Sequence, residues 1–199
     1  MNKQTVYHLF SHIPTLETGR LTLRGMRVSD APDMYAYASR EDVTRYLLWQ
    51  PHRDMSYTRD YLTYVGQRYR TGDFFDWALV CRADGRMIGT CGFTSFDFAA
   101  LSGEIGYVLN PDYSGQGLAT EAVREILRFG FERLGLHRLE ARFMRGNDRS
   151  RRLMERVGMQ FEGWARDAIR VQEQYRTVGT CAIPEQEWRS EAGGKENAE

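Results

Sequence analysis

The sequence predicts a single domain of mixed α/β class. Asp84-Gly85 lies between two β-rich runs in "WALVCRADGRMIGTCGFTSFD", and this dipeptide is typical of a tight hairpin between antiparallel strands. Apolar residues then recur at steps of three and four from Ala119 to Leu134, which predicts a long amphipathic helix. Because strands are expected on both sides of this helix, the chain must cross over the sheet. A mixed sheet with helices packed on it follows, and 199 residues with 42% hydrophobic content suffice for one such core.

The segments before the hairpin predict one strand and two helices. "RLTLRGM", residues 20–26, alternates apolar and polar residues and is expected to be a strand. Ser29 and Asp30 are suitable N-caps for a helix that follows directly, and a second helix is expected from 56 to about 70. The apolar stretch between the helices contains a proline and predicts a functional loop.

The segments after the hairpin alternate between strands and helices. Strands are expected at 104–110, 137–144, 159–165 and 177–183, with a short helix at 148–157. We expect one domain over residues 1–188. The last residues, 189–199, have almost nothing to bury and are expected to be disordered.

Charge and cysteine content exclude several classes of partner. Lys plus Arg equals Asp plus Glu at 27 each, so no overall field attracts nucleic acid or an anionic membrane. The chain has neither a signal-peptide core nor a run of apolar residues long enough to span a bilayer. Three widely spaced cysteines favour a reducing compartment, and we expect a cytoplasmic protein. The four histidines have no ligand spacing, so no metal is expected.

A glycine-rich loop precedes the long helix. A helix begins with unpaired N–H groups at the positive end of its dipole, and glycine lets an anion approach them. We therefore expect main-chain amides here to bind a phosphate or diphosphate, in a segment that comprises Ser114, Gly115, Gln116, Gly117, Leu118, Ala119 and Thr120. The lysine of a P-loop is absent after the last glycine, and the third small residue of a dinucleotide fingerprint is replaced by threonine.

The segment "EIGYVLNPDYSGQGLATEA" resembles the acetyl-CoA signature of the GCN5-related N-acetyltransferases (GNAT). The opening "IPTLETGRLTLRGMRVSDA" and the later "RGNDRSRRLMERVGMQFEG" are similar to the branch that contains the ribosomal-protein alanine N-acetyltransferases. The likeness covers about residues 14–188. It implies the GNAT fold, a mixed and mostly antiparallel sheet of six to seven strands with helices on both faces, and acetyl-CoA as cosubstrate.

The resemblance also assigns roles to residues near the donor. Glu104 is the candidate base, through a water molecule, with pairing to an arginine or strand capping as the alternative reading. Main-chain amides near Val108 and Leu109, where the strand of such enzymes bulges and splays, would stabilise the oxyanion, and Asn147 would bond the pantetheine arm. Ser150 would protonate the leaving thiolate, although it or Asp148 is equally suited to cap the helix, and water is a further alternative.

Two positions depart from the usual pattern of such enzymes. Ser114 stands where an arginine or glutamine is usual, so the amides must carry more of the diphosphate binding. Met154 stands where many members place the proton-donating tyrosine, and a thioether cannot donate a proton.

The acceptor is expected to be an amine. Residues 45–52 and 164–175 would flank it, and their aromatics, Tyr46, Trp49, Trp164 and Tyr175, line a pocket or are simply buried. The expected reaction is direct transfer of an acetyl group to a protein N-terminus or a small-molecule amine. An antibiotic- or polyamine-modifying enzyme and a non-catalytic acyl-CoA-binding module are the alternatives, and a homodimer is left open.

An arginine cluster lies beside the predicted short helix. It would bind the 3'-phosphate of coenzyme A or an acidic or ribosomal partner, or form a solvated helix face, and it comprises Arg142, Arg145, Arg149, Arg151, Arg152 and Arg156.

Overall fold

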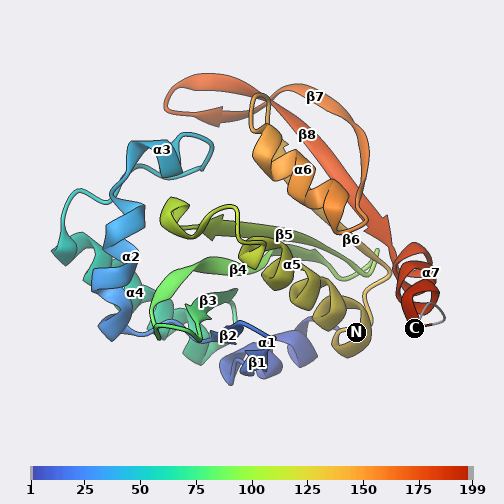
Figure 1. Ribbon diagram of the computed structural model, residues 1–199, viewed down its shortest axis with the longest axis horizontal. Helices are drawn as coiled ribbons and strands as arrows, with labels where there is room; N and C mark the ends of the chain where they lie inside the picture. Colours follow the sequence, from blue (N-terminus) through green and yellow to red (C-terminus); the bar gives the residue numbers. More distant parts are fainter. Residues whose placement is uncertain (1, 197–199) are drawn as a thin grey trace.

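The computed structural model describes residues 2–196 and contains one sheet in the order β1-β2-β3-β4-β5-β6-β8-β7 (Figure 1). The eight strands are β1 (Leu16–Glu17), β2 (Leu21–Arg24), β3 (Phe75–Cys81), β4 (Met87–Asp97), β5 (Ser102–Leu109), β6 (Arg138–Met144), β7 (Gln160–Val171) and β8 (Gln174–Pro184). Every neighbouring pair is antiparallel except β5 and β6. The predicted mixed, mostly antiparallel sheet is confirmed. It has eight strands instead of six to seven, because β1 is only two residues long and leaves no pattern in the sequence.

Helices cover both faces of the sheet, as expected. Within residues 2–196 they are α1 (Lys3–Ser11), α2 (Ala31–Ala38), α3 (Glu41–Thr44), α4 (Met55–Thr71), α5 (Leu118–Arg128), α6 (Asp148–Arg156) and α7 (Glu185–Glu196). Successive side chains of β3 point to opposite faces of the sheet. Trp77 and Leu79 pack in a cluster with α1, α5 and α6, whereas Ala78 packs in a second cluster with α2 and α4. In Figure 1, α5 lies across β4 and β5, and α2 and α4 stand together at one side.

Several boundaries differ from the predicted ones. The long helix is α-helical only to Arg128, and residues 129–133 continue it as a π-turn. The strand expected at 159–165 continues to Val171, so residues 164–175, expected to flank the acceptor, form the outer part of the β7–β8 hairpin. Helix α7 extends into the expected tail 189–199, of which residues 197–199 lie outside the described part. No helix in residues 2–196 has the length and apolarity that crossing a membrane would require.

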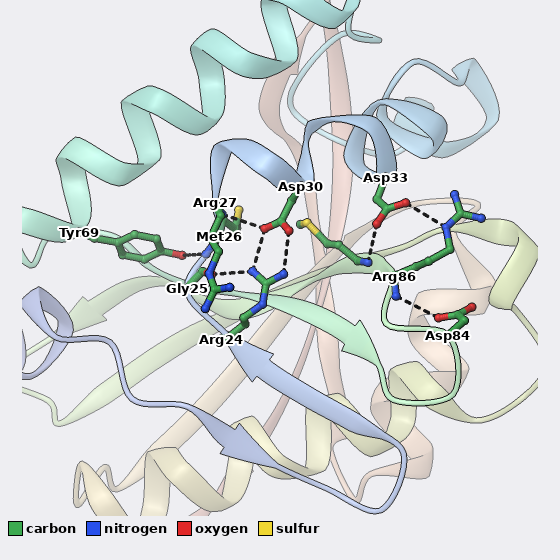
Figure 2. A network of polar contacts seen from close by, with 10 residues as sticks. Arg24, Gly25, Met26, Arg27, Asp30, Asp33, Tyr69, Asp84 and Arg86 are labelled. Carbon is green, nitrogen blue, oxygen red and sulfur yellow. Dashed lines mark hydrogen bonds and ion pairs between the residues drawn. The ribbon is translucent and has the colours of Figure 1, made fainter.

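A polar network attaches α2 to the sheet (Figure 2). Asp30 precedes α2, as predicted, but its carboxylate makes no cap bond to that helix. It accepts hydrogen bonds from Arg24 at 2.7 and 2.8 Å and from the main-chain N–H of Arg27 at 2.8 Å. Asp33 accepts bonds from Arg86 and from the main-chain N–H of Met87. These contacts fix the helix whose inner face carries part of the site described below.

Replacing Asp30 by alanine is expected to lower the free energy of unfolding by about 3 kcal/mol, because the guanidinium of Arg24 would be left buried without its partner. The side chains of Arg24 and Asp30 are only 17% and 7% exposed. Denaturant unfolding measures the change. In the matched control Asp42→Ala, the ion pair that is lost, with Arg40, is exposed, and the expected change is below about 1 kcal/mol. Equal changes in the two variants would contradict this account.

Candidate functional site

The glycine loop presents main-chain amides at the start of α5. Gly115 and Gly117 have φ of 80° and 77°, a region that only glycine adopts without strain, and Gly117 is the N-cap of the helix. Leu118 is buried in the core and anchors the first turn, while residues 114–117 are exposed. Among the described residues, no protein group accepts a hydrogen bond from the amides of residues 115–120. The loop therefore offers a set of donors at the positive end of a helix dipole.

An arginine that the sequence reasoning missed fastens this loop. Arg20 donates to the carbonyl oxygen of Gln116 at 2.7 Å and bonds the carboxylate of Glu121 through both its side chain and its main-chain N–H. Thr18 donates to the same carboxylate at 2.6 Å. Burial opposes ionisation of Glu121, but these hydrogen bonds outweigh it and lower its pKa. No local sequence pattern could have indicated this contact, because 101 positions separate Arg20 from Glu121 in sequence.

The sheet opens between β5 and β6. The two parallel strands pair only from Ser102↔Arg138 to Ile105↔Ala141, although both continue further. The N–H of Asn110 donates to Ile88 on β4. Because bonded residues alternate in an antiparallel ladder, Val108 also bonds β4, whereas the N–H of Leu109 faces the opening.

The expected bulge lies on the neighbouring strand. Val108 and Leu109 pair with β4 in regular register, and the irregularity is at Thr94 of β4, opposite Glu104 and Ile105. The splay that was expected at this strand is therefore present, but the extra residue belongs to β4. Sequence alone does not assign a bulge to one strand of a pair.

A cavity of about 660 Å³ lies beside this opening, and we call it the large cavity. It brings together six of the predicted site residues, which are Tyr46, Trp49, Glu104, Val108, Asn147 and Ser150. Gly117 and Thr120 line a separate cavity of about 490 Å³ along α5, together with Arg20, Arg124, Arg128 and Arg156. Six of the predicted residues thus line the large cavity at the sheet opening, and two line the cavity along α5.

Glu104 forms an ion pair in the large cavity. Its carboxylate accepts hydrogen bonds from Nε of Arg142 at 2.9 Å and from a terminal nitrogen of the same guanidinium. The side chain of Glu104 is 15% exposed and that of Arg142 is 49% exposed. The alternative reading of Glu104 as the partner of an arginine is therefore realised, and the carboxylate still lines the cavity.

Asn147 and Ser150 stand at the start of α6. Asn147 is the N-cap, and its side chain accepts from the N–H of Ser150 at 3.3 Å, so neither Ser150 nor Asp148 caps the helix. The Ser150 hydroxyl lies 2.8 Å from that of Tyr107 on β5. Burial raises the pKa of Tyr107, which therefore stays protonated. Tyr107 is a hydroxyl that the sequence reasoning missed, and Met154 is buried at the cavity wall.

A second carboxylate on the cavity wall was also missed. Asp76 of β3 is half-buried, and its Oδ1 is fully buried with no hydrogen-bond partner among the described residues. Burial raises the pKa of Asp76 to about 7, against weaker contacts from Thr90 and the N–H of Trp77. The hydroxyl of Tyr37 on α2 is likewise buried without a partner. Both residues line the large cavity.

The predicted acceptor aromatics separate into two groups. Tyr46 and Trp49 are half-buried and line the large cavity, and Trp49 packs against His52 with 5.3 Å between ring centroids. Trp164 and Tyr175 lie on the β7–β8 hairpin, are 39% and 65% exposed, and do not line the cavity. The hairpin contributes an isoleucine and a valine to the cavity instead.

Three of the six arginines in the cluster contact other side chains of the protein. Arg142 pairs with Glu104, Arg151 pairs with Glu155 at 2.8 Å, and Arg145 stacks on Trp164. Of the six arginines, Arg156 is the one that lines the cavity along α5. In residues 2–196, no three His, Cys, Asp or Glu side chains are grouped as a metal site would need.

Free main-chain amides at a helix start, beside an opening between parallel strands that is lined by a carboxylate and hydroxyls, are the arrangement expected of an acyltransferase that uses a coenzyme A thioester. Residues 20–160 match the family described as acetyltransferase (GNAT) domain. The chain belongs to the GNAT family and is an acetyl-CoA-dependent N-acetyltransferase. The predicted family, fold and enzyme class are confirmed.

Individual relatives agree with this assignment. The chain is 36% identical over 153 residues to the N-acetyltransferase p20 of Bacillus licheniformis, covering 77% of this chain and 86% of that protein. It is 27% identical over 188 residues to the [ribosomal protein uS5]-alanine N-acetyltransferase of Escherichia coli, covering 89% and 95%. A GNAT-family acetyltransferase from Bacillus anthracis superposes with a TM-score of 0.77 at 26% identity, covering 87% of this chain and 99% of that one.

Proposed function

We propose that this enzyme acetylates the N-terminal amine of a protein or peptide. The observation that supports this acceptor is the likeness to the uS5-alanine N-acetyltransferase, which extends over 89% of the chain. The large cavity has the size for the first residues of a peptide and carries aromatic walls. A small amine is the alternative acceptor.

The donor would lie along the glycine loop and into the sheet opening. Acetyl-CoA supplies a thioester that an amine can attack directly. The amides of residues 115–120 would bind the diphosphate, and Arg156 beside α5 is available for the 3'-phosphate. In the opening, the N–H of Leu109 would donate to the acetyl oxygen and Asn147 to the pantetheine arm.

Glu104 and Ser150 would move the two protons. Glu104 would accept the proton of the attacking amine through water, with Arg142 holding its carboxylate in place. Because protonated Tyr107 can donate to the Ser150 oxygen, the Ser150 hydroxyl hydrogen is free to point at the departing sulfur. The pair would thus do the work of the tyrosine that Met154 replaces.

The acceptor class is tested by measuring free thiol released from acetyl-CoA. The panel contains peptides with alanine or serine at the N-terminus, polyamines and aminoglycosides. We expect the peptides to be acetylated with the highest kcat/KM, and mass spectrometry to locate the acetyl group on the α-amine. Preferential acetylation of an aminoglycoside or polyamine would overturn the peptide proposal.

Substitution of the hydroxyl pair is expected to slow turnover without weakening donor binding. Ser150→Ala should lower kcat by about tenfold to a hundredfold, and Tyr107→Phe by about tenfold, because a poorly placed water must protonate the sulfur. The double variant should be no slower than Ser150→Ala, since the phenol acts through the serine. Steady-state kinetics and calorimetry with coenzyme A measure the two quantities. Additive losses in the double variant would show that the hydroxyls act separately.

A further inference from the structure

The large cavity contains one carboxylate without a cationic partner. Of the three that line it, Asp73 pairs with Arg68 at 2.7 Å and Glu104 pairs with Arg142, whereas Asp76 has no ion pair among the described residues. A buried carboxylate oxygen without a partner is unfavourable, and a functional role, a bound ion or a water molecule accounts for such groups in native structures. Asp76 is therefore the group in this cavity that a bound cation would satisfy.

The surroundings of Asp76 suit a cation. The hydroxyl of Tyr37 is buried without a partner among the described residues and lines the same cavity; burial raises the pKa of this phenol, and the charge of Asp76 raises it further. Aromatic side chains, whose faces attract ammonium and guanidinium groups, line the same cavity, and these are Trp49, His52, Tyr57, Tyr61 and Tyr64.

Two glycines of neighbouring strands line the cavity beside Asp76. Asp76 pairs with Gly92 of β4, and Gly92 pairs with Gly106 of β5. A Cβ on Gly92 would lie 2.9 Å from Oδ1 of Asp76 and 2.2 Å from the carbonyl oxygen of Phe75. Because residue 92 is glycine, no side chain from this position covers the carboxylate, and we call Gly92 and Gly106 the glycine row. An acceptor can extend over the two glycines from β5 towards β3.

The sheet geometry separates Asp76 from the proposed site of acetyl transfer. Two strand spacings lie between β3 and β5, which corresponds to roughly 10 Å. Leu109, whose N–H faces the opening, lies beyond Gly106 along β5. A cation bound at Asp76 is therefore a different group from the amine that Glu104 serves.

We propose that Asp76 and Tyr37 form a subsite for a second cationic group of the acceptor, the side chain of a lysine or arginine at the second or third residue of a peptide. An extended peptide advances about 3.4 Å per residue, so such a side chain reaches across the glycine row while the N-terminal amine lies at the opening. The inference rests on the proposed peptide acceptor and adds a sequence preference to it.

The subsite predicts a pH-dependent preference. The charge on Asp76 rises as the pH increases through about 7, and only the charged form pairs with a cation. The tyrosines and the cysteine near Asp76 stay uncharged in this pH range. Burial raises the pKa values of Tyr37, Tyr61, Tyr69 and Cys91 further above neutrality, and burial lowers that of His52 below its usual value.

The test compares peptides that differ only in charge. Ala-Arg and Ala-citrulline peptides have nearly the same shape, and the wild type should favour the arginine form at least tenfold in kcat/KM at pH 8, mainly through KM. Asp76→Asn should bring this ratio close to one while leaving the citrulline peptide unchanged within about threefold. In the wild type the ratio should fall between pH 8 and pH 6. A wild-type ratio near one, or a ratio that Asp76→Asn leaves intact, would overturn the subsite.

Two further measurements distinguish failure of the subsite from failure of the proposed peptide acceptor. Calorimetry with N-acetylated forms of the two peptides measures the subsite without any acetyl transfer, so it remains informative if no peptide is a substrate. Comparison of 1,4-diaminobutane with 1-aminobutane tests a small acceptor, and an Asp76-dependent preference seen only there would overturn the peptide assignment. Tyr37→Phe removes one hydroxyl, and an arginine preference that it leaves unchanged would remove Tyr37 from the subsite.

Discussion

Ala119→Glu is expected to raise the dissociation constant for acetyl-CoA by about a thousandfold, since the new carboxylate would repel the diphosphate and cover the amides that we propose bind it. Ala119 is half-buried in the first turn of α5, two positions after the N-cap Gly117. The variant should nevertheless be as stable as the wild type or more stable, because an acidic side chain in the first turn of a helix interacts favourably with its dipole. Calorimetry with coenzyme A and thermal unfolding measure the two effects.

Two other substitutions provide the controls for the charge argument. Ala119→Gln introduces the same volume without charge and should weaken binding by less than about tenfold. Ser114→Arg introduces a side chain that is usual at this position of the acetyl-CoA signature, and should tighten binding by about threefold to tenfold. Equal losses in the glutamate and glutamine variants would show that shape, and not an anion site, explains the effect.

The glycine loop and the order of strands were predictable because both leave local patterns. Two glycines ahead of a periodic helix indicate a turn with positive φ, and Asp84-Gly85 indicates a hairpin, so neighbouring residues were enough. Helix α1 was missed because its apolar positions are few, and only Val6 and Phe10 are buried. The extent of the β7–β8 hairpin was missed because most of β7 and the first two residues of β8 are exposed, so they carry little apolar pattern.

The parts of the site that could not be predicted depend on register between distant segments. Asp76 lies opposite Gly92 only because β3 and β4 pair in one register, and nothing in "FFDWALV" marks its carboxylate as unpaired. The Arg142 partner of Glu104 is 38 positions away and comes from the one parallel pair of strands in residues 2–196. Sequence identified residue types suited to chemistry, whereas their partners followed from the folded sheet.

The ion pair between Glu104 and Arg142 affects what a substitution of Glu104 can show. Glu104→Gln is expected to lower kcat by about a hundredfold to ten-thousandfold, which is the usual contribution of a positioned base, while the affinity for acetyl-CoA stays within about threefold of the wild type. The amide keeps the size of the side chain but cannot accept the proton of the amine. It also breaks the ion pair with Arg142, so a loss of turnover has two explanations.

Arg142→Gln separates these explanations, because it removes the ion pair but leaves the carboxylate. If Glu104 is the base, this variant should lose less than about tenfold in kcat. Glu140→Gln is the matched control, since Glu140 lies directly opposite Glu104 in the β5–β6 register and pairs with Arg138 at 3.2 Å. Its kcat should equal that of the wild type. If Arg142→Gln is as slow as Glu104→Gln, the ion pair positions the strands at the opening, and the proton of the amine must leave by another route.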